Sequence, residues 1–148
     1  MDLKELYIVI NVSLIFTTMI LPDLVIAPSE KGGKGGKGVF TTKAFKVGTI
    51  VEISPVLVFT GKEYLHLAET MLYNYVFEWG ATRKKAALAL GYISMYNHSY
   101  SANCEYEMDF DNNLMTIKVV KPIKKGEELF INYNAEPDNK NKVWFDAK

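Results

Sequence analysis

The chain has 148 residues, of which 49% are hydrophobic, and its 17 basic residues balance its 17 acidic residues. This length suits one domain with its own core, and the apolar content excludes an intrinsically disordered chain. The balanced charge argues against nucleic acid or an anionic membrane as a direct partner. The single cysteine excludes an internal disulfide and a multi-cysteine zinc site, and it fits a reducing compartment such as the cytoplasm.

An apolar stretch without charges occupies residues 6–21. It is shorter than the roughly 20 residues that a membrane span needs, and it lacks the positive flank of a signal peptide. We interpret it as a buried strand, or as an extension upstream of a natural start at Met19, in preference to a membrane anchor. Residues 1–21 are therefore treated as a separate N-terminal segment whose role the sequence leaves open.

The next segments predict short strands and one helix. A loop rich in glycine and lysine at residues 29–40 leads into a strand. The β-branched run at 49–59 is interrupted by Pro55, which predicts two short strands. Thr60 followed by Glu63 has the pattern of a capping box, which predicts a short helix through residue 71.

Two further segments complete this half of the chain. The aromatic-rich residues 72–79 predict either a strand or the end of a helix. Residues 84–96 have helical propensity, but Gly91 interrupts them, and we predict a strand followed by a single turn.

Strict alternation makes residues 104–111 the clearest strand of the sequence. One face carries the apolar residues Cys104, Tyr106, Met108 and Phe110, and the other carries the acidic residues Glu105, Glu107, Asp109 and Asp111. This period of two is typical of a half-buried strand. Residues 114–120 follow as its hairpin partner, and a second turn leads to residues 129–133. The pattern predicts a mostly β domain, whose acidic face is either simply solvated or attractive to a basic substrate.

No metal site or reactive thiol is expected. Neither His66 nor His98 has a neighbouring ligand at metal-binding spacing. Cys104 lies on the apolar face of its strand, where a thiol is usually an inert small hydrophobe. The glycine-rich loop lacks the Lys-Ser/Thr ending of a P-loop and precedes a strand, so by itself it indicates no function.

Three segments in a fixed order carry the functional signal: GKGVF at 36–40, NHSYSANC at 97–104 and GEELFINY at 126–133. Together they resemble the SET domain, the β-fold of protein lysine methyltransferases that use S-adenosylmethionine. The resemblance covers about residues 22–133 and implies several small sheets with a C-terminal pseudoknot and little helix. We therefore expect a SET domain at 22–134 and a short tail at 135–148. The zinc-binding cysteine-rich flanks of the family are absent, so the chain resembles a minimal form.

The resemblance also implies a cofactor site. The side chain of Asn97 and the backbone of His98 would hold the methionine and adenine parts of S-adenosylmethionine, while the His98 ring packs inside the knot. Gly36 and Gly38, on either side of Lys37, would let the backbone approach the cofactor closely. Trp144 or Phe145 could fold back as a lid over the adenine. The expected cofactor-binding residues are Lys37, Gly38, Phe40, Asn97, His98, Tyr133 and Trp144.

Tyr133 matches the catalytic tyrosine of the family, and Tyr106 would line the lysine channel. Deprotonating a free lysine at pH 7 costs about 4.6 kcal/mol. Repulsion from the cofactor's positive sulfonium, about 4 kcal/mol at about 4 Å, would offset most of this cost. No strong base is therefore needed, and we assign Tyr133 to orientation. Ile131 stands where many members carry an aromatic residue that limits the number of methyl groups added, so the sequence leaves that number open.

The expected partner is a protein or peptide that carries a lysine, for example in a basic tail, and a homodimer is compatible with the sequence. The alternative hypothesis is a non-catalytic SET-fold binding module, against which the presence of both Asn97 and Tyr133 argues. A third hypothesis, a membrane-tethered structural protein, rests on residues 6–21 alone.

Overall fold

The computed structural model describes residues 18–31 and 36–145. Most of the N-terminal segment at residues 1–21 lies outside these ranges, but Met19–Ile20 form a short strand, β1. Across the part of the chain that is described, no helix is long and apolar enough to cross a membrane.

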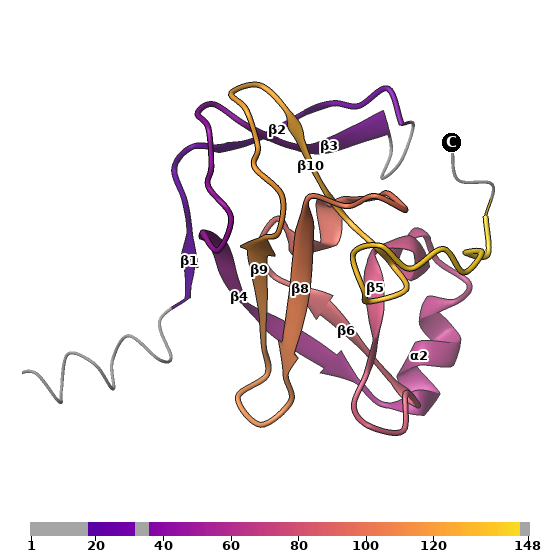
Figure 1. Cartoon of the computed structure of the whole chain (residues 1–148). Coiled ribbons are helices and arrows are strands. Elements are labelled where there is room, and N and C mark those ends of the chain that lie inside the picture. The colour runs from indigo at the N-terminus through magenta and orange to yellow at the C-terminus, as the bar shows by residue number, and fades with distance from the viewer. Residues whose placement is uncertain (1–17, 32–35, 146–148) are drawn as a thin grey trace, which may run out of the picture.

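Strands dominate the fold, as predicted, and within the described residues they form two curled sheets (Figure 1). The larger sheet contains β1, β4 (Ile50–Phe59), β5 (Val76–Trp79), β6 (Lys85–Ala89), β8 (Cys104–Asp109) and β9 (Leu114–Val119). Its order is β5-β6-β4-β9-β8, with β1 on β4. The smaller sheet has the order β2-β3-β10-β7 and contains β2 (Leu24–Pro28), β3 (Lys37–Thr41), β7 (Asn97–His98) and β10 (Glu128–Ile131). Helical turns are short: α2 (Gly61–Leu67), η2 (Met71–Tyr75) and η3 (Ile93–Met95).

The prediction of two strands around Pro55 is wrong, because β4 runs through the proline as one strand. Pro55 lies where β4 exchanges partners: the strand pairs with β9 up to Pro55 and with β6 from Val56 onward. A residue without an N–H is tolerated at such a change of partner. A register shift between Ile50 and Glu52 precedes it, and the Glu52 side chain is fully buried.

The predicted capping box is confirmed at the start of α2. The Thr60 hydroxyl accepts the Glu63 N–H, and the Glu63 carboxylate accepts the Thr60 N–H. The helix ends at Leu67 instead of continuing to residue 71, because Thr70 accepts the N–H of Leu72 and so begins a separate 3-10 helix, η2. The aromatic stretch is thus a helical turn followed by strand β5.

The predicted hairpin is formed by β8 and β9, with Cys104 opposite Val119 and Asp109 opposite Leu114. On the acidic face, Lys118 makes salt bridges to Glu105 and Glu107. These pairs offset part of the negative charge that a basic substrate would meet.

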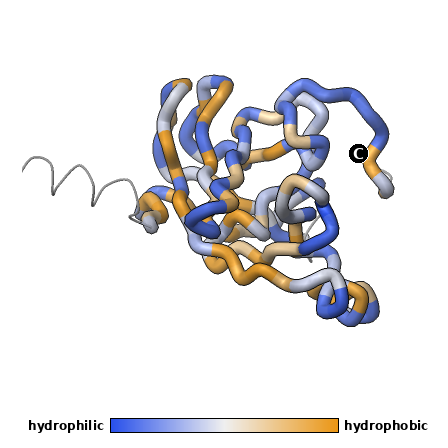
Figure 2. Tube along the Cα trace, turned by 90° about the horizontal axis from the view of Figure 1, so that it is seen from below, coloured by the Kyte–Doolittle hydropathy of each residue, from blue (hydrophilic) through white to orange (hydrophobic). Residues whose placement is uncertain are grey.

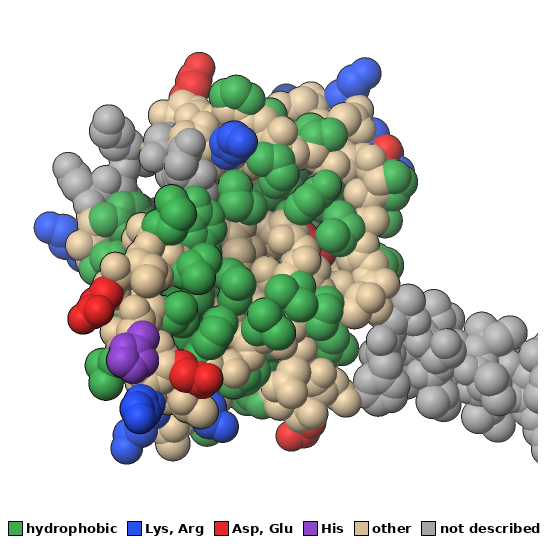
Figure 3. All heavy atoms as spheres, turned by 180° about the vertical axis from the view of Figure 1, so that it is seen from behind, with side chains coloured by type: hydrophobic (Ala, Val, Ile, Leu, Met, Phe, Trp, Pro, Cys, Tyr) green, Lys and Arg blue, Asp and Glu red, His purple; other side chains and the backbone are tan. Residues whose placement is uncertain are grey.

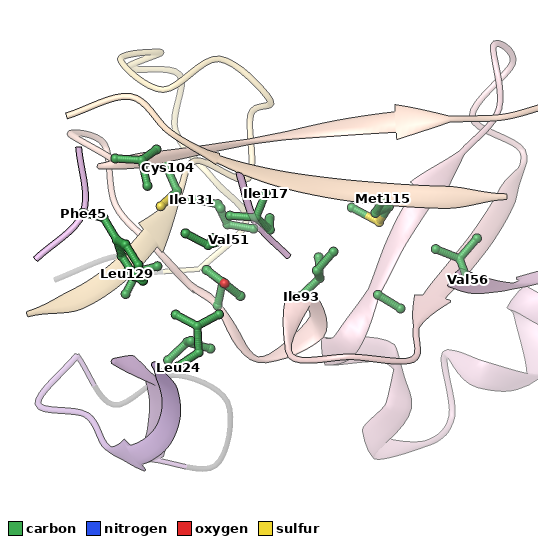
Figure 4. Close-up of a cluster of buried hydrophobic side chains, with 14 of the residues drawn as sticks. Leu24, Phe45, Val51, Val56, Ile93, Cys104, Met115, Ile117, Leu129 and Ile131 are labelled. Carbon is green, nitrogen blue, oxygen red and sulfur yellow. The ribbon is translucent and has the colours of Figure 1, made fainter. Parts of the chain in front are cut away.

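One hydrophobic core joins the two sheets. Figure 2 shows hydrophobic segments along the strands, whereas hydrophilic segments occupy turns and much of the C-terminal region. In Figure 4, Leu129 and Ile131 lie toward one end of the cluster and Val56 lies at the other. The fully buried members include Val39, Val51, Ile93, Tyr96, Cys104, Met115, Ile117, Val119, Leu129 and Ile131.

Strand β10 lies between two segments that are distant in sequence. It pairs antiparallel with β3 and parallel with β7, where Phe130 is opposite Asn97 and Ile131 is opposite His98. The chain beyond β10 then returns past the segment after β7, since the N–H of Ala102 donates to the carbonyl of Pro137. This crossing corresponds to the predicted pseudoknot and brings the quoted motifs together.

Candidate functional site

Asn97 occupies a polar junction between β3, β7 and β10. Its Nδ2 donates to the Lys37 backbone carbonyl at 2.9 Å and to Glu128 Oε1 at 2.7 Å. Both partners are acceptors, so they fix the orientation of the amide. Asn97 Oδ1 is buried and has no hydrogen-bond partner within the described residues. The other Glu128 oxygen accepts the Ser29 hydroxyl at 2.8 Å.

Gly38 leaves the space that this junction needs. A Cβ at this position would overlap Glu128 Oε1 and lie 2.8 Å from Asn97 Nδ2. The glycine is therefore required by neighbouring side chains of the protein itself. Gly36, by contrast, has a φ of +77° with nothing close to its Cβ position, so it serves the turn into β3.

His98 packs inside the crossing as the sequence suggests. Its Nδ1 accepts the backbone N–H of Tyr133 at 3.1 Å, and its ring lies edge-on to Tyr100 with centroids 4.5 Å apart. Burial lowers the pKa of His98, which favours the neutral ring. Because Nδ1 accepts, the proton of the neutral ring lies on Nε2. That nitrogen is buried and has no partner within the described residues.

Tyr133 adjoins these groups through its backbone and its ring. Its hydroxyl donates to the backbone carbonyl of Tyr96 at 2.9 Å. Burial raises the pKa of the Tyr133 hydroxyl well above its ordinary value, so the group stays protonated at neutral pH. Since its hydrogen is engaged by Tyr96, the oxygen can meet a substrate only as an acceptor.

The C-terminal tail packs against this site. The ring of Trp144 stacks on Tyr133 with centroids 5.8 Å apart, and Phe145 lies edge-on to His98 at 5.9 Å. Val143 anchors the tail, because its side chain is buried and its N–H donates to the Tyr100 hydroxyl. Trp144 is 72% exposed, so one face of its ring is covered and the other is open to solvent.

The remaining predicted residues lie around this junction in different ways. Lys37 contributes its backbone carbonyl, and its side chain is exposed. Phe40 lies on β3 opposite Glu128 and is half-buried. Tyr106 lies on β8 of the other sheet, where its ring is 5.4 Å from Phe77. Burial raises the pKa of Tyr106, so it too is protonated at neutral pH.

Sequence reasoning missed Glu128, Ser29 and Tyr100 as parts of the site. Glu128 stands in the quoted GEELFINY segment, but its contact with Asn97 joins positions 31 residues apart. Ser29 is 99 residues from Glu128. Only the motifs could have drawn attention to Glu128 and to Tyr100, which stands in NHSYSANC, and no local signal indicates Ser29.

Within residues 18–31 and 36–145, no group of three or more His, Cys, Asp and Glu side chains could hold a metal ion. The absence of structural zinc stays a prediction. Burial raises the pKa of the Cys104 thiol to about 12, which keeps it protonated and unreactive.

Comparisons with known proteins bear on the family and on the fold of this chain. The SET domain family model matches residues 36–134. A histone-lysine N-methyltransferase of Schizosaccharomyces pombe, specific for H3 lysine-37, is 37% identical over 112 residues, which cover 75% of this chain and 71% of that protein. The chain therefore belongs to the SET domain family. It is a protein-lysine N-methyltransferase of the class that depends on S-adenosylmethionine, as its sequence predicted.

Solved structures show the same fold. A proposed histone methyltransferase of Plasmodium falciparum aligns with a TM-score of 0.56 at 29% identity, over 77% of this chain and 95% of that chain. A Polycomb Repressive Complex 2 structure from Chaetomium thermophilum aligns with a TM-score of 0.60 at 19% identity, over 77% of this chain and 15% of that chain. The second likeness concerns the fold alone.

Proposed function

We propose that Asn97, His98 and Tyr133 bind S-adenosylmethionine and direct its methyl group to a lysine in a basic protein tail, of which a histone tail is the leading candidate. The observation that carries this proposal is the pair of buried, unpartnered atoms Asn97 Oδ1 and His98 Nε2. A buried polar group without a partner costs about 1–3 kcal/mol. A ligand that supplies both partners recovers that cost.

The chemistry of these residues fits the cofactor. Asn97 Oδ1 is an acceptor that suits an ammonium group. The Glu128 carboxylate, which accepts the hydrogen bond of Asn97 Nδ2, adds negative charge beside it. His98 Nε2 is a donor. The rings of Trp144 and Phe145 offer the apolar surface that a flat heteroaromatic base prefers.

When bound, S-adenosylmethionine supplies an electrophilic methyl group and a positive charge that disfavours a protonated lysine. The chain's own residues provide orientation. With its hydrogen held by the Tyr96 carbonyl, the Tyr133 hydroxyl presents its oxygen as an acceptor to the incoming amine. Its raised pKa argues against a role as a base. Tyr106, half-buried and aromatic, is proposed as a wall of the lysine channel.

The substrate proposal rests mainly on the relative that is named for histone H3. The acidic face of β8 contributes less than its sequence suggests, because Lys118 pairs with Glu105 and Glu107. Recognition of a basic tail is therefore expected to depend on groups besides this face.

The test is single-turnover methyl transfer from isotopically labelled S-adenosylmethionine to histone H3 tail peptides, with each lysine in turn replaced by arginine. We expect label on lysine only, lost when one particular lysine is replaced. Tyr73→Phe, which removes the hydroxyl of an exposed tyrosine on η2, is the matched control for Tyr133→Phe and should retain the wild-type rate. Absence of transfer to every basic protein tested, with cofactor binding intact, would contradict the proposal.

A homodimer is also proposed as one assembly of the protein. The face in Figure 3 carries many hydrophobic side chains. Large hydrophobic residues that are exposed among the described ones include Leu57, Leu65, Met71, Leu72 and Leu90. Exposed apolar surface of this kind often marks a contact with another protein. Light scattering at increasing protein concentration tests self-association. The cytoplasmic location stays a prediction.

A further inference from the structure

A buried carboxylate lies behind the segment that leads into the site. Glu52 of β4 is fully buried, and its Oε1 accepts three hydrogen bonds: from the Ser54 hydroxyl at 2.7 Å, from the Tyr92 N–H at 2.6 Å and from the Ile93 N–H at 3.2 Å. The two backbone donors lie at the start of η3. The carboxylate thus holds the beginning of residues 92–96, which we call the support segment.

The Glu52 side chain also lies near Tyr96, at the end of the same segment. Tyr96 is fully buried near the Glu52 carboxylate, and both its hydroxyl and Glu52 Oε2 are buried without a hydrogen-bond partner among the described residues. Burial, and then the negative charge of Glu52, raise the pKa of Tyr96 well above its ordinary value. The Tyr96 hydroxyl therefore stays protonated near the Glu52 carboxylate.

The fold leaves room for this arrangement at Gly91. A Cβ at this position would overlap both Glu52 Oε1 and Ser54 Oγ. The backbone at Gly91, just before the support segment, therefore packs directly against the Glu52 carboxylate. Burial of a carboxylate is costly, and burial raises the pKa of Glu52. A buried carboxylate at this position therefore costs stability, so stability alone does not explain it.

The last residue of the support segment, Tyr96, contacts the Tyr133 hydroxyl. The backbone carbonyl of Tyr96 accepts the hydrogen bond of the Tyr133 hydroxyl at 2.9 Å. We propose that Glu52 is a positioning residue: by holding the start of the support segment through the Tyr92 and Ile93 N–H groups, and by lying near the Tyr96 ring at its end, it fixes the Tyr96 carbonyl and so aims the Tyr133 oxygen. This inference rests on the methyl-transfer role proposed for Tyr133.

A double-mutant cycle tests the proposal. Tyr96→Phe keeps the buried ring and removes only the hydroxyl near Glu52. We expect it to lower the single-turnover rate by about tenfold, the scale of a slight misalignment of the Tyr133 hydroxyl. Cofactor affinity should change by less than about threefold. In the Tyr133→Phe background the effect of Tyr96→Phe on the rate should largely vanish, because the hydroxyl that it aims is gone.

Two further variants separate positioning from stability. Glu52→Gln keeps an acceptor for the three donors and should retain most of the rate, whereas Glu52→Leu leaves those donors unpaired and should lose more than Tyr96→Phe. Val56→Ala removes buried volume at the far end of the core cluster (Figure 4) and controls for lowered stability. It should lower the melting temperature without lowering the rate at 25 °C.

A measurement without turnover distinguishes failure of this inference from failure of the proposed function. In protein labelled with ¹³C at the tyrosine ring, the resonance of the Tyr133 carbon that bears oxygen should shift in Tyr96→Phe and stay fixed in Val56→Ala. An unchanged Tyr133 resonance, or an equal loss of rate in both Tyr133 backgrounds, overturns the positioning role. A shifted resonance in a protein that methylates nothing supports the positioning and rejects the proposed function.

Discussion

Gly38→Ala provides a sharp test of the junction around Asn97. The added methyl group would overlap Glu128 Oε1, which is the end of a flexible side chain. We therefore expect the protein to fold and the Glu128 carboxylate to rotate away. That rotation breaks its 2.7 Å bond to Asn97 Nδ2 and its 2.8 Å bond to the Ser29 hydroxyl.

The magnitude follows from the bond to Asn97. A hydrogen bond to a charged group contributes about 1.5–3 kcal/mol, and about 1.4 kcal/mol corresponds to a factor of ten. An Asn97 amide that is no longer held should therefore bind S-adenosylmethionine or its demethylated product roughly 10- to 100-fold more weakly. Isothermal titration calorimetry on the purified protein measures this change, and circular dichroism confirms that the variant is folded.

The matched control is the same substitution in a protein that lacks the Glu128 side chain. If the methyl group acts through Glu128, Gly38→Ala combined with Glu128→Ala should bind the cofactor as Glu128→Ala alone does, within about twofold. A full additional loss in the double variant would mean that the methyl group acts without Glu128, by displacing the Asn97 amide 2.8 Å away or by meeting the cofactor. Wild-type affinity in Gly38→Ala would refute the reasoning about the junction altogether.

Further expectations concern Tyr133, Glu52 and metal ions. Tyr133→Phe should lower the single-turnover rate by about a hundredfold, the scale for one preorganised polar group, with little change in cofactor affinity. Because burial raises the pKa of Tyr133, the rate–pH profiles of wild type and Tyr133→Phe should be parallel between about pH 7 and pH 9.5; an inflection lost in the variant would make Tyr133 a base. Burial raises the pKa of Glu52 above its ordinary value of 4.5, so the folded state binds the Glu52 proton more tightly than the unfolded state. The free energy of unfolding therefore falls as pH rises from the unfolded-state pKa to the folded-state pKa of Glu52. Glu52→Gln should therefore gain stability relative to wild type with rising pH, and denaturant titrations that show the opposite trend would reject this assignment. Metal chelators should leave fold and activity intact, and stoichiometric zinc in the purified protein would contradict that expectation.

Local patterns predicted the elements whose stabilisation is local. Alternation identified β8, and the Thr60–Glu63 pair identified the start of α2. Pro55 was misjudged because a proline normally ends pairing, whereas here a second partner strand takes over at the next residue. Tertiary pairing overrode the local signal in that case.

The candidate site was proposed from its motifs and not from its contacts. Asn97 and Tyr133 stand in recognisable segments, but the bonds that orient them come from distant residues: Glu128 for the amide and the support segment for the hydroxyl. The burial of Glu52 depends on donors about 40 residues away in sequence. No pattern within β4 distinguishes this carboxylate from a solvated one, so its role emerges only when the chain is folded.

The most direct test of the central claim is a crystal structure of the protein with the demethylated cofactor bound. We predict a hydrogen bond from the ligand's ammonium group to Asn97 Oδ1, with Asn97 Nδ2 still donating to Glu128 and to the Lys37 carbonyl. The Tyr133 hydroxyl should border the sulfur of the ligand while it still donates to the Tyr96 carbonyl. A ligand bound away from Asn97, or one that leaves Asn97 Oδ1 without a partner, would contradict the account.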